Sequence, residues 1–266
     1  MGKDKKSAKQ QIVVIHGGNT FDTYRKYIDF LKSYKIDIDR LGEKRWKENL
    51  AEGLGKSFDV ILLKMPNPTN AKYKEWKIML ERLFPFLTDN PILLGHSLGG
   101  IFLAKYLSEN KFPKNILATF IVAAPYRMGN FILPKNLSKL RKQGGKIFIY
   151  HSKDDPIIPF SDFEKYKRDL PEAKAMVFRN RGHFGQTEFP EIIKGKTFRE
   201  LMEEKDGIPE KAIKQYVDIK DSIIPRFKKD VRLKEYKNAM EEFECEISCL
   251  GNVMVDKNGN IKIIDW

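Results

Sequence analysis

Residues 92–100 read Ile-Leu-Leu-Gly-His-Ser-Leu-Gly-Gly. An apolar run leads to Gly95, Ser97 follows two residues later, and Gly99 completes a G-x-S-x-G pattern. This spacing is typical of a serine on a sharp strand-to-helix turn, where small flanking residues keep the strand and the helix from clashing. Because an amphipathic pattern follows over residues 101–107, we interpret Ser97 as a nucleophile exposed at the start of a helix.

Around this stretch, six short apolar runs alternate with helical patterns, which predicts a parallel sheet with helices on both faces. The runs are 12–15, 58–63, 92–94, 116–122, 146–150 and 174–178, and the expected helices are 22–33, 40–54, 71–84, 97–110 and 160–170. Functional groups of such sheets lie at the carboxyl ends of the strands. The histidines, His16, His96, His151 and His183, all map to that edge. We expect the first three to orient loops or to be structural.

A serine hydroxyl is a weak nucleophile and needs a histidine base that a carboxylate orients. On parallel sheets of this type the chain order is serine, acid, histidine. Asp155 begins a D-P-I-I-P turn after the fifth strand, and His183 follows the sixth strand. Asp154 is the alternative acid, but Pro156 stiffens the loop behind Asp155. We therefore expect Ser97, Asp155 and His183 to be the catalytic residues.

Acyl transfer also needs two backbone N–H groups that stabilise a developing oxyanion. The residue after the nucleophile, Leu98, supplies one candidate. The loop after the first strand, residues 16–20, contains two glycines that let its backbone turn toward Ser97. Gly18 or Asn19 is the expected second donor.

The bulk composition limits the remaining possibilities. The chain has 266 residues, a formal net charge of +13 and 32% charged residues. We interpret most of the charge as a solvated surface, and in the absence of a nucleic-acid-binding motif we do not expect nucleic acid as a partner. A protein partner on the basic surface or the tail stays open. With two cysteines, no secretory signal pattern and no apolar run of ~18 residues, a cytoplasmic location without a transmembrane segment is expected.

Three regions are expected along the chain. Residues 1–10 read as a basic disordered tail, and 11–195 contain every strand of the predicted sheet. Residues 196–266 read as a mainly helical extension that ends in a β-hairpin, because Asn258-Gly259 separates two apolar runs.

Taken together, these motifs resemble the α/β-hydrolase superfamily and, within it, the YdeN-like (retinoblastoma-binding-type) serine hydrolases. The matching segments are 14–18, 65–66, Trp76, 95–99, 155–159 and 182–184. The resemblance implies a small or absent lid and gives Ser97, Asp155 and His183 the catalytic roles. It does not supply a substrate, and the segment 36–57 is longer than a minimal member needs.

The tail carries a second resemblance. Residues 251–266 are similar to the catalytic loop and metal-binding strand of aminoglycoside-phosphotransferase-like kinases. Cys245 and Ile247 stand where such kinases have their catalytic histidine and aspartate. Because Ile247 cannot accept a proton, phosphoryl transfer is not expected.

The leading hypothesis is a carboxylesterase-like serine hydrolase that cleaves a small ester, thioester or amide through an acyl-enzyme. Such chemistry needs no metal or organic cofactor, and its partner is a small-molecule acyl substrate. The alternative is a binding or scaffold protein on a hydrolase fold, which uses its basic surface and helical tail.

Overall fold

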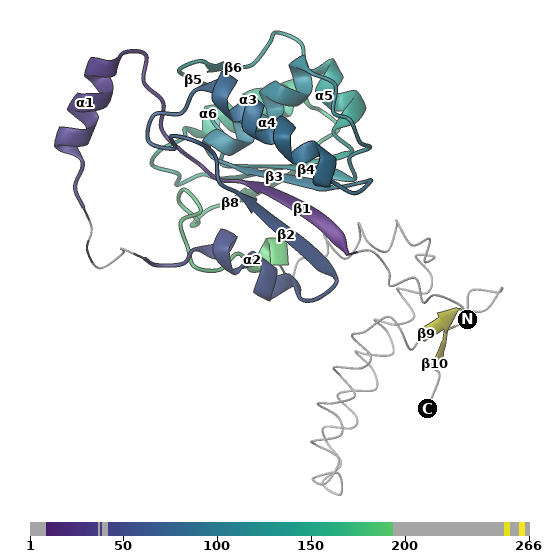
Figure 1. Cartoon of the computed structure of the whole chain (residues 1–266). Coiled ribbons are helices and arrows are strands. Elements are labelled where there is room, and N and C mark those ends of the chain that lie inside the picture. The colour runs from purple at the N-terminus through teal and green to yellow at the C-terminus, as the bar shows by residue number, and fades with distance from the viewer. Residues whose placement is uncertain (1–8, 37, 39–41, 194–252, 256–260, 264–266) are drawn as a thin grey trace, which may run out of the picture. The chain divides into compact units, whose positions relative to one another are not determined.

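The computed structural model describes residues 9–36, 38, 42–193, 253–255 and 261–263 (Figure 1). The chain divides into two compact units, residues 1–196 and 197–266. Most of the expected N-terminal tail lies outside the described residues, although Gln10 is already the buried first residue of the first strand. The expected helices of the extension and the kinase-like pattern around Cys245 also lie outside them.

A six-stranded sheet forms the centre of the first unit, in the order β2-β1-β3-β4-β7-β8, and every neighbouring pair is parallel. This confirms the predicted sheet. The strands are β1 (Gln10–Ile15), β2 (Phe58–Leu63), β3 (Ile92–His96), β4 (Ala118–Val122), β7 (Lys146–Ser152) and β8 (Lys174–Phe178).

Helices cover both faces of the sheet, as the alternating pattern predicted. In Figure 1, α3, α4, α5 and α6 lie on one side of the sheet and α2 lies on the other. The helices are α1 (Tyr24–Ser33), α2 (Trp46–Leu54), α3 (Tyr73–Leu83), α4 (Leu98–Glu109), α5 (Ser138–Gln143), α6 (Phe160–Asp169) and α7 (Pro190–Ile193), with a 3₁₀ turn η2 (Phe84–Phe86). Sequence reasoning did not predict α5, α7 or the 3₁₀ turn.

Between β4 and β7 the chain forms only α5 and a short antiparallel hairpin, β5 (Arg127–Met128) and β6 (Phe131–Ile132). The hairpin tip lies close to the loop after β1, since a Cβ added to Gly129 would be 2.7 Å from Thr20 Cγ2. A small or absent lid was expected, and this hairpin and α5 are the elements that the segment between β4 and β7 contains.

The strand register places the carboxyl ends of β1, β3 and β4 at one edge of the sheet. Ile15 of β1 is opposite Gly95 of β3, and His96 is opposite Val122 of β4. The loops that follow these strands therefore start at one edge of the sheet. Every residue of β3 is buried, as are most residues of α4, so Ser97, which joins them, is held between two buried elements of the core.

In the second unit the described residues are two strands, β9 (Val253–Val255) and β10 (Ile261–Ile263). They pair antiparallel, with Ile261 opposite Val255, whereas the predicted turn at Asn258-Gly259 lies outside the described residues. None of the helices within the described residues has the length and apolar character needed to cross a membrane.

Candidate active site

Ser97 lies on the sharp turn that the sequence predicted. Its backbone has φ 55° and ψ −122°, a conformation that non-glycine residues rarely adopt. A Cβ added to Gly95 would be 2.4 Å from the Gly99 carbonyl oxygen, and one added to Gly99 would be 2.3 Å from the Ile15 carbonyl oxygen. Both positions therefore exclude any side chain, which is the physical reason for the G-x-S-x-G spacing.

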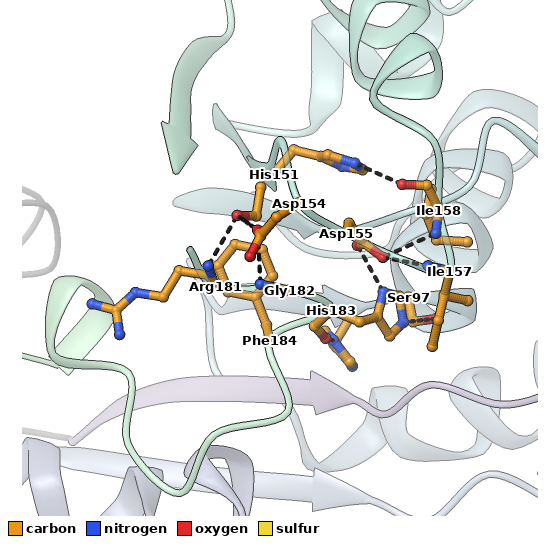
Figure 2. Close-up of polar contacts among 12 residues, drawn as sticks. Ser97, His151, Asp154, Asp155, Ile157, Ile158, Arg181, Gly182, His183 and Phe184 are labelled. Atoms are coloured by element: carbon orange, nitrogen blue, oxygen red, sulfur yellow. Dashed lines mark hydrogen bonds and ion pairs between the residues drawn. The ribbon is translucent and has the colours of Figure 1, made fainter. Parts of the chain in front are cut away.

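A continuous line of hydrogen bonds joins three of the predicted residues (Figure 2). Ser97 Oγ lies 2.9 Å from His183 Nε2, and His183 Nδ1 lies 2.8 Å from Asp155 Oδ2. The carboxylate can only accept, so Nδ1 carries the proton and Nε2 accepts from the serine hydroxyl. The arrangement has the geometry of a nucleophile, a general base and an orienting acid.

Asp155 is held as an anion in a fixed orientation. Its side chain is 0% exposed, and Oδ1 accepts hydrogen bonds from the backbone N–H groups of Ile157 at 2.9 Å and Ile158 at 3.0 Å. Burial by itself raises the pKa of Asp155, but the hydrogen bonds from His183, Ile158 and Ile157 outweigh it, so the pKa lies below its usual value. One carboxylate oxygen therefore faces the backbone and the other faces His183.

Asp154, the alternative acid, has a different set of contacts. Its Oδ1 accepts hydrogen bonds from the Ser152 hydroxyl and, at 3.0 Å, from the Gly182 N–H. The hydrogen bond from Ser152 is the main reason why the pKa of Asp154 lies below its usual value. Asp154 thus ties the loop after β7 to the loop that carries His183 (Figure 2).

The structure also distinguishes between Gly18 and Asn19, the two candidate oxyanion donors in the loop after β1. The Asn19 N–H donates to the Pro68 carbonyl at 2.8 Å, so Asn19 as oxyanion donor is corrected: its N–H is already used. Within the described residues, the N–H groups of Gly18 and Leu98 have no hydrogen-bond acceptor. A Cβ on Gly18 would be 2.6 Å from the Pro68 oxygen, so this close approach requires glycine.

Two buried side chains, His96 and Trp46, hydrogen-bond to backbone carbonyls of the loop that carries His183. His96 Nε2 lies 2.9 Å from the His183 carbonyl, and Trp46 Nε1 donates to the Phe184 carbonyl at 2.9 Å. Burial lowers the pKa of His96 well below its usual value, so its ring stays neutral. Trp46 belongs to α2, inside the long segment 36–57. Sequence reasoning missed this role, and a tryptophan in an otherwise polar helical segment was the available signal.

The other two histidines orient loops, as expected. His16 Nε2 accepts from the Met65 N–H at 2.9 Å, so its Nδ1 carries the proton that is donated to the Gly17 carbonyl. His151 Nε2 lies 3.1 Å from the Ile158 carbonyl. Within the part of the chain that the structure describes, no three His, Cys, Asp or Glu side chains are grouped so that they could hold a metal ion.

Comparisons with known proteins identify the family of this chain. The family model described as serine hydrolase matches residues 39–193. The serine hydrolase RBBP9 of Rattus norvegicus is 28% identical over 142 residues, which cover 52% of this chain and 75% of the relative. The hydrolase YdeN of Bacillus subtilis is 25% identical over 191 residues, 67% of this chain and 88% of its own.

Solved structures show the same fold. The crystal structure of YdeN from B. subtilis superposes with a TM-score of 0.54 at 21% identity and covers 73% of this chain and 99% of its own. A YdeN-like hydrolase from Pectobacterium atrosepticum gives a TM-score of 0.51 at 15% identity, over 73% and 92% of the two chains. At these identities the likeness concerns the α/β-hydrolase fold.

Proposed function

This chain belongs to the serine hydrolase family, and we propose that it is a carboxylesterase-like enzyme that cleaves a small ester, thioester or amide through an acyl-enzyme. The single observation that carries the proposal is the line of hydrogen bonds from Ser97 through His183 to Asp155. We also infer a cytoplasmic location, which the presence of only two cysteines supports.

In the proposed first half-reaction, Ser97 Oγ attacks the substrate carbonyl carbon while His183 Nε2 takes the hydroxyl proton. Asp155 stabilises the imidazolium that forms. The negative charge on the carbonyl oxygen is stabilised by the N–H groups of Gly18 and Leu98. When the intermediate collapses, His183 gives its proton to the leaving alcohol, thiol or amine, and the acyl group stays on Ser97.

In the second half-reaction a water molecule takes the place of the leaving group. His183 removes a proton from the water, the resulting hydroxide attacks the acyl carbon, and the proton returns to Ser97 as the carboxylic acid departs. Apart from the substrate and this water, every group that the scheme uses is a side chain or backbone N–H of the described residues.

A fluorophosphonate probe tests the proposal directly, because it reacts with activated serines. We expect one adduct at Ser97 by intact-mass spectrometry and peptide mapping, and no adduct on Ser97→Ala. Ser108, a buried serine in α4 that hydrogen-bonds to the Ala104 carbonyl, provides a matched control: Ser108→Ala should still be labelled. Folded protein without any adduct would refute the enzyme and favour the alternative of a binding or scaffold protein on a hydrolase fold.

A further inference from the structure

The helix α1 differs from the other long helices of the first unit because none of its residues is buried. Its sequence is nevertheless strongly amphipathic. At 100° per residue, one stripe carries only apolar and aromatic side chains, and the opposite side is polar. Tyr24 is 73% exposed, and Tyr34, which directly follows the helix, is 61% exposed. The apolar stripe consists of Tyr24, Tyr27, Ile28, Phe30, Leu31 and Tyr34.

A helix of this kind needs a surface on which to pack. An isolated helix of ten residues is marginal in water, and helices in proteins gain most of their stability from burying an apolar face. The apolar surface continues past the helix in Ile36 and Ile38, which are also exposed. The family match begins at residue 39, so α1 lies before the matched region.

The charges around α1 indicate which kind of surface the helix packs on. Residues 22–36 contain four basic side chains, Arg25, Lys26, Lys32 and Lys35, and two acidic ones, Asp22 and Asp29. The whole chain carries a formal charge of +13. A second copy of this chain would be repelled by like charge, whereas an anionic lipid surface is complementary to it. Lys26 pairs with Asp22 at 3.2 Å, and the polar side of α1 stays net positive through Arg25 and Lys32. An apolar and aromatic side opposite a net basic side is typical of helices that lie in the membrane interface.

The base of α1 is fixed to the loops beside the active site. Phe21 ends the loop that contains Gly18, and its ring centroid lies 5.0 Å from that of Phe30. The Phe21 N–H donates to Asn70 Oδ1, and the Phe21 carbonyl accepts from Lys72 Nζ at 2.9 Å. In the loop after β7, Ile157 is exposed and its N–H donates to Asp155. An exposed apolar side chain therefore also lies next to the catalytic acid.

We propose that α1 docks on an anionic lipid surface and presents Ser97 to acyl substrates held there, so that the substrate is an amphiphilic ester or thioester with its acyl chain in the lipid. The substrate part rests on the proposed function, whereas the docking part does not. The exposed members of the stripe, Tyr24, Leu31 and Tyr34, provide the apolar contact, and the basic side chains provide the preference for negative charge.

Vesicle co-sedimentation of the full chain tests the docking. We expect binding to phosphatidylcholine vesicles that contain phosphatidylglycerol, weak binding to pure phosphatidylcholine vesicles, and loss of binding at high salt. The double variant Tyr24→Ser/Leu31→Ser and the double variant Arg25→Glu/Lys32→Glu should each lower the partition coefficient by about tenfold or more.

Matched controls change equally exposed residues elsewhere. Ile78→Ser/Phe86→Ser removes two exposed apolar side chains, and Lys111→Glu/Lys135→Glu reverses two exposed charges. Both controls should bind within about twofold of the wild-type protein if the effect belongs to α1. Circular dichroism of all four variants establishes that they are folded.

Three results would overturn the proposal. They are the absence of vesicle binding by the wild-type chain, binding that both α1 variants retain in full, and an α1-dependent dimer in light scattering, which would assign the stripe to a second copy. The substrate part is tested with p-nitrophenyl palmitate dispersed in the anionic vesicles: hydrolysis should depend on α1. Fluorophosphonate labelling of wild-type Ser97 is measured alongside, because its failure would count against the proposed function and not against docking.

Discussion

Replacing Asp155 with asparagine keeps the size of the side chain and removes its charge, and the contacts of Asp155 determine how the new amide must lie. The side-chain oxygen Oδ1 accepts two backbone N–H groups, from Ile157 and Ile158. An NH₂ group at that position would face two donors, so the amide oxygen has to stay there. The NH₂ group of the introduced amide then faces His183 Nδ1 in place of Oδ2.

This orientation gives His183 the wrong tautomer. Facing a donor, Nδ1 has to accept, so the ring proton moves to Nε2, which can then no longer accept the proton of Ser97. A neutral triad acid of this kind lowers kcat by about 10³–10⁴-fold, which corresponds to about 4–5.5 kcal/mol in the barrier. Asp154→Asn removes no contact to His183, and its amide oxygen can still accept from Ser152 and Gly182, so we expect a loss below about tenfold.

The assay is the steady-state hydrolysis of p-nitrophenyl butyrate by the wild-type protein, Asp155→Asn and Asp154→Asn, with urea unfolding as the check on the fold. If Asp154→Asn is the slower variant, the acid is Asp154 and the reasoning from the contacts is wrong.

The stability of the fold below neutral pH gives a second test of the role of Asp155. Because the pKa of Asp155 lies below its unfolded value of about 3.9, the charge stabilises the fold above that pH and ceases to do so as the pH falls through the folded-state pKa. Asp155→Asn should lack this contribution.

The remaining predictions concern the supports of the site. Gly99→Ala places a Cβ against the Ile15 carbonyl, so it should lower the free energy of unfolding in urea by about 1–3 kcal/mol and slow the labelling of Ser97 by the probe. The control is Gly185→Ala, where a Cβ meets nothing within 4 Å, and it should change neither quantity. Trp46→Phe leaves the Phe184 carbonyl without its donor, so we expect a loss of about 1–3 kcal/mol and slower labelling, and unchanged kinetics would show that α2 does not position His183. A chain that ends near residue 195 should keep Ser97 reactivity, and loss of labelling with an intact circular dichroism spectrum would show that residues 196–266 complete the site.

The turn that carries Ser97 and the sheet edge on which it lies were predictable from the sequence because their constraints are local. The glycines around Ser97 follow from the backbone approach at a single turn, and the apolar runs are continuous because both faces of the sheet are covered. The choice of Asp155 over Asp154 also followed from local stiffness, since Pro156 restrains the turn.

What the sequence could not supply depends on contacts between distant segments. The Trp46 side chain reaches a carbonyl 138 residues away along the chain, and no periodicity encodes such a pairing. The two donors Gly18 and Asn19 looked equivalent because their difference arises only from Pro68, on another loop. The hairpin β5–β6 has strands of two residues each, too short to produce an alternating pattern.

At Ser97, selection for stability and selection for activity favour different residues. A non-glycine residue held at φ 55° and ψ −122° costs the folded state on the order of 1–3 kcal/mol, and glycine would relieve most of it. In a library varied at this position, enrichment for thermal resistance alone would favour glycine, while enrichment for ester turnover would keep serine. Thermal resistance and turnover are therefore expected to favour different residues at this one position.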